Sequence, residues 1–169
     1  MTVAYKFLRP GRVGAFTGVQ WPEAGRWLDS DDEPQLCRSG IHALKPSALP
    51  KWMTEELWRV ELEDAQELER GIVLARRGRL IDRVTAWNDD LAREYGEACI
   101  AHVPEGGPPI AQQRRADALA ELAGVRAGGQ AAAVGYIAAK AADALTAGGY
   151  DSERQWQAAW LSDRLGLSC

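Results

Sequence analysis

The 169-residue sequence predicts an α+β fold, in which a small, mainly antiparallel sheet from the first half is covered by about four helices from the second half. Two observations support this prediction. Short apolar segments separated by turn residues, the clearest of them alternating with period two, occupy residues 1–84, whereas apolar residues recur every three or four positions in residues 85–169. The length suits one domain with a substantial core, so we expect the two halves to form one compact folding unit.

Strands are expected through the first half because β-favouring segments alternate with turn residues. Residues 56–62 show the cleanest period-two alternation, and a short helix is expected over residues 46–53. Arg76-Arg77-Gly78-Arg79 separates the last two predicted strands and indicates a hairpin turn. The predicted strands cover residues 3–8, 25–28, 35–43, 56–62, 72–75 and 80–84.

Helices are expected from Thr85 onward. Thr85 is the predicted N-cap of the first helix, which the proline and glycine residues of 104–109 would end. Ser152 and Gln155 form a capping-box pattern at the start of the last helix. Between them, helices are predicted over residues 110–123 and 130–146.

Composition excludes several classes of protein. With 46% hydrophobic and 26% charged residues, the chain has the composition of a globular protein. No apolar run approaches the 18 or more residues that cross a bilayer, so no membrane partner is expected. A formal net charge of -4 argues against a nucleic-acid partner, because nucleic-acid binding depends on a positive field. The opening residues lack the features of a secretory signal and three scattered cysteines do not form a disulfide framework, which predicts a cytoplasmic protein.

The two histidines each lie close to a cysteine in the sequence. His42 follows Cys37 by five residues, and His102 follows Cys99 by three. If the pairs met in space, their four sulfur and nitrogen donors would suit zinc, which stays an alternative cofactor. A metal site is not favoured, because Cys99 and His102 belong to the apolar face of a predicted helix and a buried cysteine usually acts as a small hydrophobe.

Acid–base or thiol chemistry is the favoured role of the segment from Cys37 to His42. A thiolate needs a nearby cation or base, and Arg38 or His42 could provide it. Five steps along an extended strand place Cys37 and His42 on opposite faces, so a direct pair requires a kink at Ser39-Gly40. We therefore predict His42 as the acid–base residue and Cys37 as a nucleophile or auxiliary thiol. The alternative is that His42 only anchors a strand end by hydrogen bonds.

Aromatic residues predict a pocket near this segment. Trp21, Trp27 and Trp52 lie in loops or weak structure and could line a pocket for a flat ligand, with Tyr95 contributed by the first long helix. Together with Arg38 they are the predicted substrate-binding residues. The alternative role of the tryptophans is a lid over the small sheet.

A basic cluster consists of Arg76, Arg77, Arg79 and Arg83. We interpret it as an exposed hairpin tip whose arginines keep a sheet edge from pairing with other strands. No aromatic residue is interleaved with these arginines in the sequence, as a stacking platform for nucleic-acid bases would require.

Cys37, Gly40, Ile41 and His42, supported by Tyr5-Lys6 and by the strand from Leu57 to Leu62, carry a resemblance to a known family. The first half resembles an uncharacterised domain family of bacterial and phage proteins that has a Cys-x-x-Gly-apolar-His segment. This resemblance implies no activity, and it marks Cys37 to His42 as one structural unit. The second half looks like the helical extension of actinobacterial relatives.

The sequence is thus interpreted as a small-molecule-handling enzyme with an acid–base or thiol site around Cys37 to His42, and its partner would be a small-molecule ligand. One alternative is a non-catalytic interaction or regulatory module with structural cysteines and histidines. A second is a zinc-binding protein. A third rests on the segment around His42, which is also similar to part of the ADP-ribosyltransferase fold, although the usual first-strand Arg or His is not matched. The substrate and the oligomeric state are left open.

Overall fold

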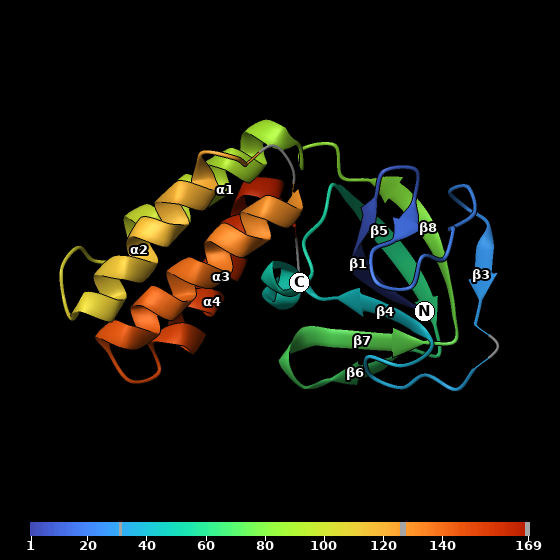
Figure 1. Ribbon diagram of the computed structural model, residues 1–169. Helices are drawn as coiled ribbons and strands as arrows, with labels where there is room; N and C mark the ends of the chain where they lie inside the picture. The colour runs from blue at the N-terminus through green and yellow to red at the C-terminus, as the bar shows by residue number, and fades with distance from the viewer. Residues whose placement is uncertain (31, 126–127, 168–169) are drawn as a thin grey trace.

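The computed structural model describes residues 1–30, 32–125 and 128–167. Within these ranges the chain forms one eight-stranded antiparallel sheet and four α-helices, which confirms the α+β fold class (Figure 1). The helices pack together on one side of the molecule and the sheet lies on the other, with a short 3-10 helix, η1, between them (Figure 1). None of the described helices has both the length and the apolar character needed to span a membrane.

The sheet has the strand order β3-β8-β5-β1-β4-β7-β6, and β2 pairs with β1 at one side. β1 and β5, two of its long central strands, are segments whose alternation is clear in the sequence. Period-two patterning places alternate side chains on the same face of a strand, so the apolar residues can be buried together. The strands are β1 (Thr2–Arg9), β2 (Val13–Gly14), β3 (Trp27–Asp29), β4 (Ile41–Leu44), β5 (Glu56–Glu63), β6 (Gln66–Leu68), β7 (Ile72–Ala75) and β8 (Arg77–Arg83).

The sheet opens between β1 and β4. β1 pairs with β5 along its length, from Thr2↔Leu62 to Leu8↔Glu56. In contrast, its register with β4 contains the single pair Tyr5↔Leu44. β1 and β4 therefore diverge on either side of this pair. Main-chain N–H and C=O groups that the two strands do not share must find other hydrogen-bond partners.

Two local predictions for the first half were wrong. The predicted strand over residues 35–43 begins only at Ile41, and residues 35–39 form a turn closed by the bridge Gln35↔Ser39. The predicted hairpin at residues 76–79 is absent, because β7 pairs with β4 and β6 whereas β8 pairs with β5 and β3. The single residue Arg76 links β7 to β8. In the antiparallel order of the sheet these two strands point the same way, so the chain passes from β7 to β8 without reversing its direction.

The helices lie close to their predicted positions, but two caps differ. Asn88, not Thr85, caps the first helix, because its Oδ1 accepts a hydrogen bond from the main-chain N–H of Leu91 at 3.0 Å. The last helix begins before the predicted capping box, since Gly148, with a φ of 75°, reverses the chain directly after the preceding helix. The helices are α1 (Asp89–His102), α2 (Pro109–Leu122), α3 (Gly128–Leu145) and α4 (Gly149–Leu165).

The core has two parts, one on each face of the sheet. Tyr5 and Phe7 of β1 belong to the larger part, which continues through Trp87 into the helices. Ala4 and Leu8, on the opposite face of the same strand, belong to the smaller part. η1 (Pro46–Lys51) fills the space between sheet and helices, and the Arg154 guanidinium of α4 donates a hydrogen bond to the carbonyl oxygen of Pro50 at 2.6 Å.

Candidate functional site

A cavity of about 810 Å³ lies where β1 and β4 diverge. Its wall includes residues 5–7 of β1 and all of β4, so the cavity occupies the opening in the sheet. The segment between β1 and β3 contributes Phe16 and Trp21, and Trp52 follows η1. Phe16, Trp21, Trp52 and Lys6 therefore border a space large enough for a small molecule.

Five of the seven residues predicted as catalytic or substrate-binding line this cavity. They are Trp21, Cys37, Arg38, His42 and Trp52, which come from three separate segments of the chain. Trp52 contacts two other rings edge-on, with ring centroids 6.0 Å from His42 and 6.5 Å from Phe16. The fold thus brings together most of the predicted site, and Trp27 and Tyr95 are not part of it.

The Cys37 to His42 segment contains a kink of the kind that a direct Cys37–His42 pair would require. Gly40 has a φ of 84° and Cys37 a φ of 60°, so the chain turns instead of extending. The main-chain N–H of Cys37 donates to Nε2 of His42 at 3.0 Å, and Nδ1 of His42 lies 3.2 Å from the carbonyl oxygen of Gly40. The neutral tautomer with its hydrogen on Nδ1 satisfies both contacts. His42 therefore binds the main chain of the turn, while the Cys37 side chain is exposed to solvent.

The environment of His42 favours its neutral form. Burial lowers the pKa of the imidazole, and the nearby Lys6 ammonium lowers it further, while the contact with the Gly40 carbonyl acts in the opposite direction. Protonation would also remove the acceptor that holds the Cys37 N–H. With both nitrogens engaged by the main chain, His42 is better placed to hold the turn than to exchange protons with a ligand.

Lys6, like Phe16, lines the cavity although the sequence did not predict it as a site residue. It lies on β1 between Ala4 and Leu8, which are buried on the same face of the sheet. Its Nζ donates a hydrogen bond to the carbonyl oxygen of His42 at 2.6 Å and lies 5.5 Å from the centroid of the Trp21 ring. Burial lowers the pKa of Lys6 to about 8. The sequence feature that could have identified Lys6 is its position in an alternating strand, where a lysine stands at a place typical of a buried apolar residue.

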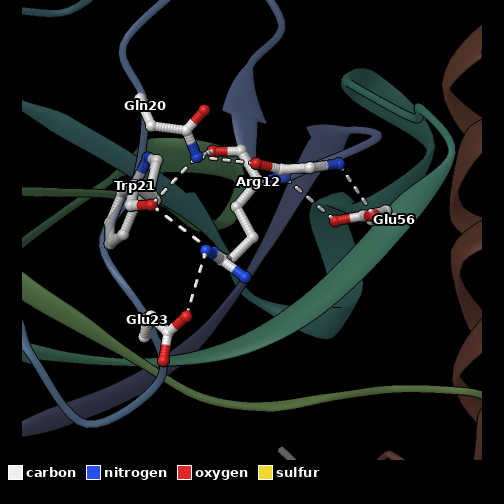
Figure 2. A network of polar contacts seen from close by, with 6 residues as sticks. Arg12, Gln20, Trp21, Glu23 and Glu56 are labelled. Carbon is white, nitrogen blue, oxygen red and sulfur yellow. Dashed lines mark hydrogen bonds and ion pairs between the residues drawn. The ribbon is translucent and has the colours of Figure 1, made fainter.

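A polar network holds Trp21 in the cavity wall (Figure 2). The buried carboxylate of Glu56 accepts hydrogen bonds from the main-chain N–H groups of Gly11 and Arg12, at 3.2 and 3.3 Å. The Arg12 guanidinium and the Gln20 amide then contact the carbonyl oxygen of Trp21, at 3.5 and 3.1 Å. β5 thus fixes the turn after β1, and this turn places the Trp21 ring against the Lys6 amine.

Trp27 lies outside the cavity, which corrects its predicted role. The guanidinium groups of Arg77 and Arg79 stand over its ring, 4.7 and 4.8 Å from the centroid. No aromatic residue is interleaved with these arginines in the sequence, but β3 pairs with β8 and brings Trp27 to them. Carboxylates on β3 and β5 neutralise the arginines, and a second hollow of about 450 Å³ beside them is lined mainly by such paired charges.

Tyr95 and Cys99 lie in the core of the helices, so Tyr95 does not line the cavity as predicted, while Cys99 has the buried position that the sequence favoured for it. Tyr95 is fully buried and its hydroxyl donates to Oε1 of Gln157 at 3.0 Å. Burial raises the pKa of the Cys99 thiol well above its ordinary value, so this sulfur is a neutral core atom. His102 stacks on Trp156 with ring centroids 3.8 Å apart, and its Nδ1 lies 2.6 Å from the carboxylate of Glu153.

The proposed zinc set is not assembled. Cys37 is exposed on the turn before β4, Cys99 is buried in α1, and His102 pairs with Glu153. In the described ranges, no group of three or more His, Cys, Asp or Glu residues is arranged to hold a metal ion. The physical reason is that Cys37 and His42 lie in the turn before β4 and in β4 itself, whereas Cys99 and His102 lie on α1, so the two cysteine–histidine pairs do not meet.

Comparisons with protein-family models, with curated proteins and with solved structures found no match to this chain. The resemblance of the first half to a bacterial and phage domain family therefore stays a prediction.

Proposed function

We propose that this protein is an enzyme that binds a flat small molecule in the cavity between β1 and β4 and acts on it with acid–base chemistry. The observation that carries the proposal is the placement of the Lys6 amine in an aromatic wall made by Phe16, Trp21 and Trp52. Tryptophan and phenylalanine rings favour a planar ligand, and an amine with a pKa of about 8 can both donate and accept a proton near neutral pH.

The proposal moves the reacting group from His42 to Lys6. His42 would act as a positioning residue, because its carbonyl oxygen holds the Lys6 amine and its ring holds the turn that carries Arg38. Arg38 and Cys37 are exposed at the cavity and could contact polar groups of the ligand. A thiol–imidazole pair is not needed for this chemistry.

The test is a screen of small planar metabolites by thermal shift, followed by turnover assays on the compounds that bind. Lys6→Met retains the length and apolar stem of the side chain, and Lys140→Met, on α3 and outside the cavity wall, is the matched control. We expect Lys6→Met to lose turnover of the bound compound by at least about 100-fold, the scale of a removed acid–base group, while Lys140→Met keeps it. Equal turnover in both variants would contradict the proposal.

An interaction module is the second candidate, and it is favoured by exposed apolar side chains at the cavity. Phe16 is 79% exposed and Val19 is also exposed in the cavity wall, and the exposed Leu36 precedes the wall residue Cys37. A partner protein that covers these residues would be sensitive to Leu36→Ser, at a residue outside the cavity wall, and insensitive to Lys6→Met, the reverse of the pattern expected for the enzyme. The ADP-ribosyltransferase-like alternative predicts consumption of NAD, which the same screen measures by including NAD among the compounds.

A further inference from the structure

Lys6 differs from the other lysines of the described chain in what surrounds its amine. Lys45 and Lys140 form ion pairs with Glu67 and Asp143, and Lys51 donates to the carbonyl oxygen of Arg70 outside the cavity. Among the described residues, no carboxylate lies within ion-pair distance of the Lys6 amine, whose hydrogen-bond partner is the carbonyl oxygen of His42. An ammonium without a counter-ion in an aromatic wall is held there at a cost in stability.

This arrangement suits a nucleophilic amine. A lysine attacks a carbonyl compound only in its neutral form, and removal from water without an anionic partner favours that form. The single carbonyl acceptor fixes the direction of the side chain, while the cavity beside it leaves space for a reacting group. The pKa of about 8 agrees with the geometry, since a useful fraction of the amine is neutral near pH 7.5.

The charge of the wall argues for a carbonyl compound over an anion. Lys6 and Arg38 are accompanied in the wall by Asp29 and Asp32, so the described part of the cavity has no excess of positive charge. An anionic substrate would also keep Lys6 protonated by pairing with it. A flat aldehyde or ketone needs neither an anion site nor a metal ion.

We propose that Lys6 forms a Schiff base with an aldehyde or ketone bound between Phe16, Trp21 and Trp52, a proposal that rests on the function proposed above for the same cavity. The Nζ lone pair attacks the carbonyl carbon, and the C=O π electrons move to oxygen, which takes up a proton. The carbinolamine nitrogen loses a proton, and its hydroxyl group takes up a second proton and leaves as water while the nitrogen lone pair forms C=N, which gives the protonated imine. Hydrolysis by the reverse steps returns the free amine.

The test uses the full chain with 2-naphthaldehyde as the probe and cyanoborohydride as the reductant that converts the imine to a stable amine. Peptide mass mapping separates Lys6 from Lys45, Lys140 and the N-terminal amine. At pH 7.5 we expect Lys6 to be labelled at least about tenfold faster than Lys45 and Lys140, because ordinary lysines with a pKa near 10.4 are almost fully protonated. Lys140→Met should leave the labelling of Lys6 unchanged.

A second measurement separates this proposal from the proposed function. The alcohol 2-naphthylmethanol has the same shape as the probe and cannot form an imine, so its quenching of tryptophan fluorescence reports binding alone. Binding of the alcohol with no preferential labelling of Lys6 would overturn the Schiff base and leave the cavity as a ligand site. Neither binding nor labelling, in protein whose circular dichroism is native, would overturn both. Protection of Lys6 from the aldehyde by excess alcohol would support both.

Discussion

His42 and Lys6 reach the same cavity from neighbouring strands, and their side chains have different partners there. The His42 ring is satisfied by main-chain groups of its own turn, whereas the Lys6 amine reaches across the opening to the His42 carbonyl oxygen. The ring therefore stabilises the turn, while the amine occupies a position that costs stability. A residue retained at such a cost is a candidate for function.

Replacing His42 tests its role in the turn. His42→Ala removes the acceptor of the Cys37 N–H and the donor to Gly40, so we expect the free energy of unfolding to fall by about 1–3 kcal/mol. In the wild-type protein, the contribution of His42 to the free energy of unfolding should also decline as the pH falls below 6.5. The pKa of His42 is lower in the folded protein than in the unfolded chain, so the unfolded chain takes up the proton first. Urea unfolding at pH 5.5 and 7.5 measures both effects. Unchanged hydrogen exchange at the Cys37 amide would contradict this role, and Arg38→Ala is the exposed control.

The pH dependence of stability tests the environment of Lys6. Its folded pKa of about 8 lies below the ordinary value of 10.5, so the unfolded chain binds the proton more tightly. We expect Lys6→Met to be more stable than wild type at pH 7, and this difference to shrink as the pH rises from 8 to 10.5. Urea unfolding of the two proteins across this range gives the comparison. A difference that stays constant would show that the amine is not desolvated in the folded protein.

At the scale of elements, the turn before β4 and the opening beside β1 form the site together. Gly40 allows the turn, because a Cβ there would lie 2.9 Å from Pro34 Cα and the residue has a positive φ. The turn returns the Cys37 main chain to the His42 ring. The parity of the Cys37–His42 spacing indicated only that a direct pair would require a kink at Ser39-Gly40, and neither the kink itself nor the hydrogen-bond partners of the ring could be predicted.

A comparison of Gly40 with Gly25 distinguishes the cost of backbone strain from the cost of a steric clash, because the two glycines have nearly equal φ angles. Gly40 has a φ of 84° and close neighbours, whereas Gly25 has a φ of 85° and open space around the Cβ position. We expect Gly25→Ala to cost about 1 kcal/mol for the left-handed angle alone, and Gly40→Ala to cost about 1–2 kcal/mol more. Urea unfolding of both variants gives the difference. Equal losses would mean that the turn before β4 can move away from Pro34.

Across the whole molecule, η1 connects the cavity to the helices. Trp52, which directly follows η1, lines the cavity, and the Pro50 carbonyl within η1 accepts from Arg154 of α4. Arg154 also donates to Oε1 of Gln157 at 2.9 Å, and Gln157 accepts from the buried Tyr95. Hydrogen bonds thus connect Tyr95 in the helix core, through Gln157 and Arg154, to Pro50. Pro50 lies two residues before Trp52 of the cavity wall.

Arg154→Met tests this connection. The variant keeps the apolar stem and loses two charge-assisted hydrogen bonds, so we expect a loss of about 1.5–3 kcal/mol in the free energy of unfolding. Arg164→Met is the control on the same helix, where the exposed guanidinium pairs with Glu94 and should matter less. Urea unfolding followed by tryptophan fluorescence gives both values. A loss no greater than that of the control would show that η1 is held by apolar packing alone.

Secondary structure was predicted correctly where the spacing of apolar residues is compatible with only one type of element. Period-two alternation over Glu56–Glu63 requires a strand, and the spacing of apolar residues after Asn88 requires a helix. Prediction failed at the link between β7 and β8, because no local pattern shows that β8 pairs with β5 and β3 instead of folding back on β7. It failed for Trp27 for the same reason, since only the pairing of β3 with β8 places arginines over that ring.

The α+β architecture, the approximate extents of its four helices and the strands with the clearest alternation are properties of the sequence alone, since local periodicity specifies them. The cavity is a property of the tertiary structure. β1 and β4 diverge after one registered pair, and only this divergence turns a lysine on an apolar face into an amine beside Trp21. Such an opening depends on contacts between residues about 40 positions apart, which no local pattern in the chain records.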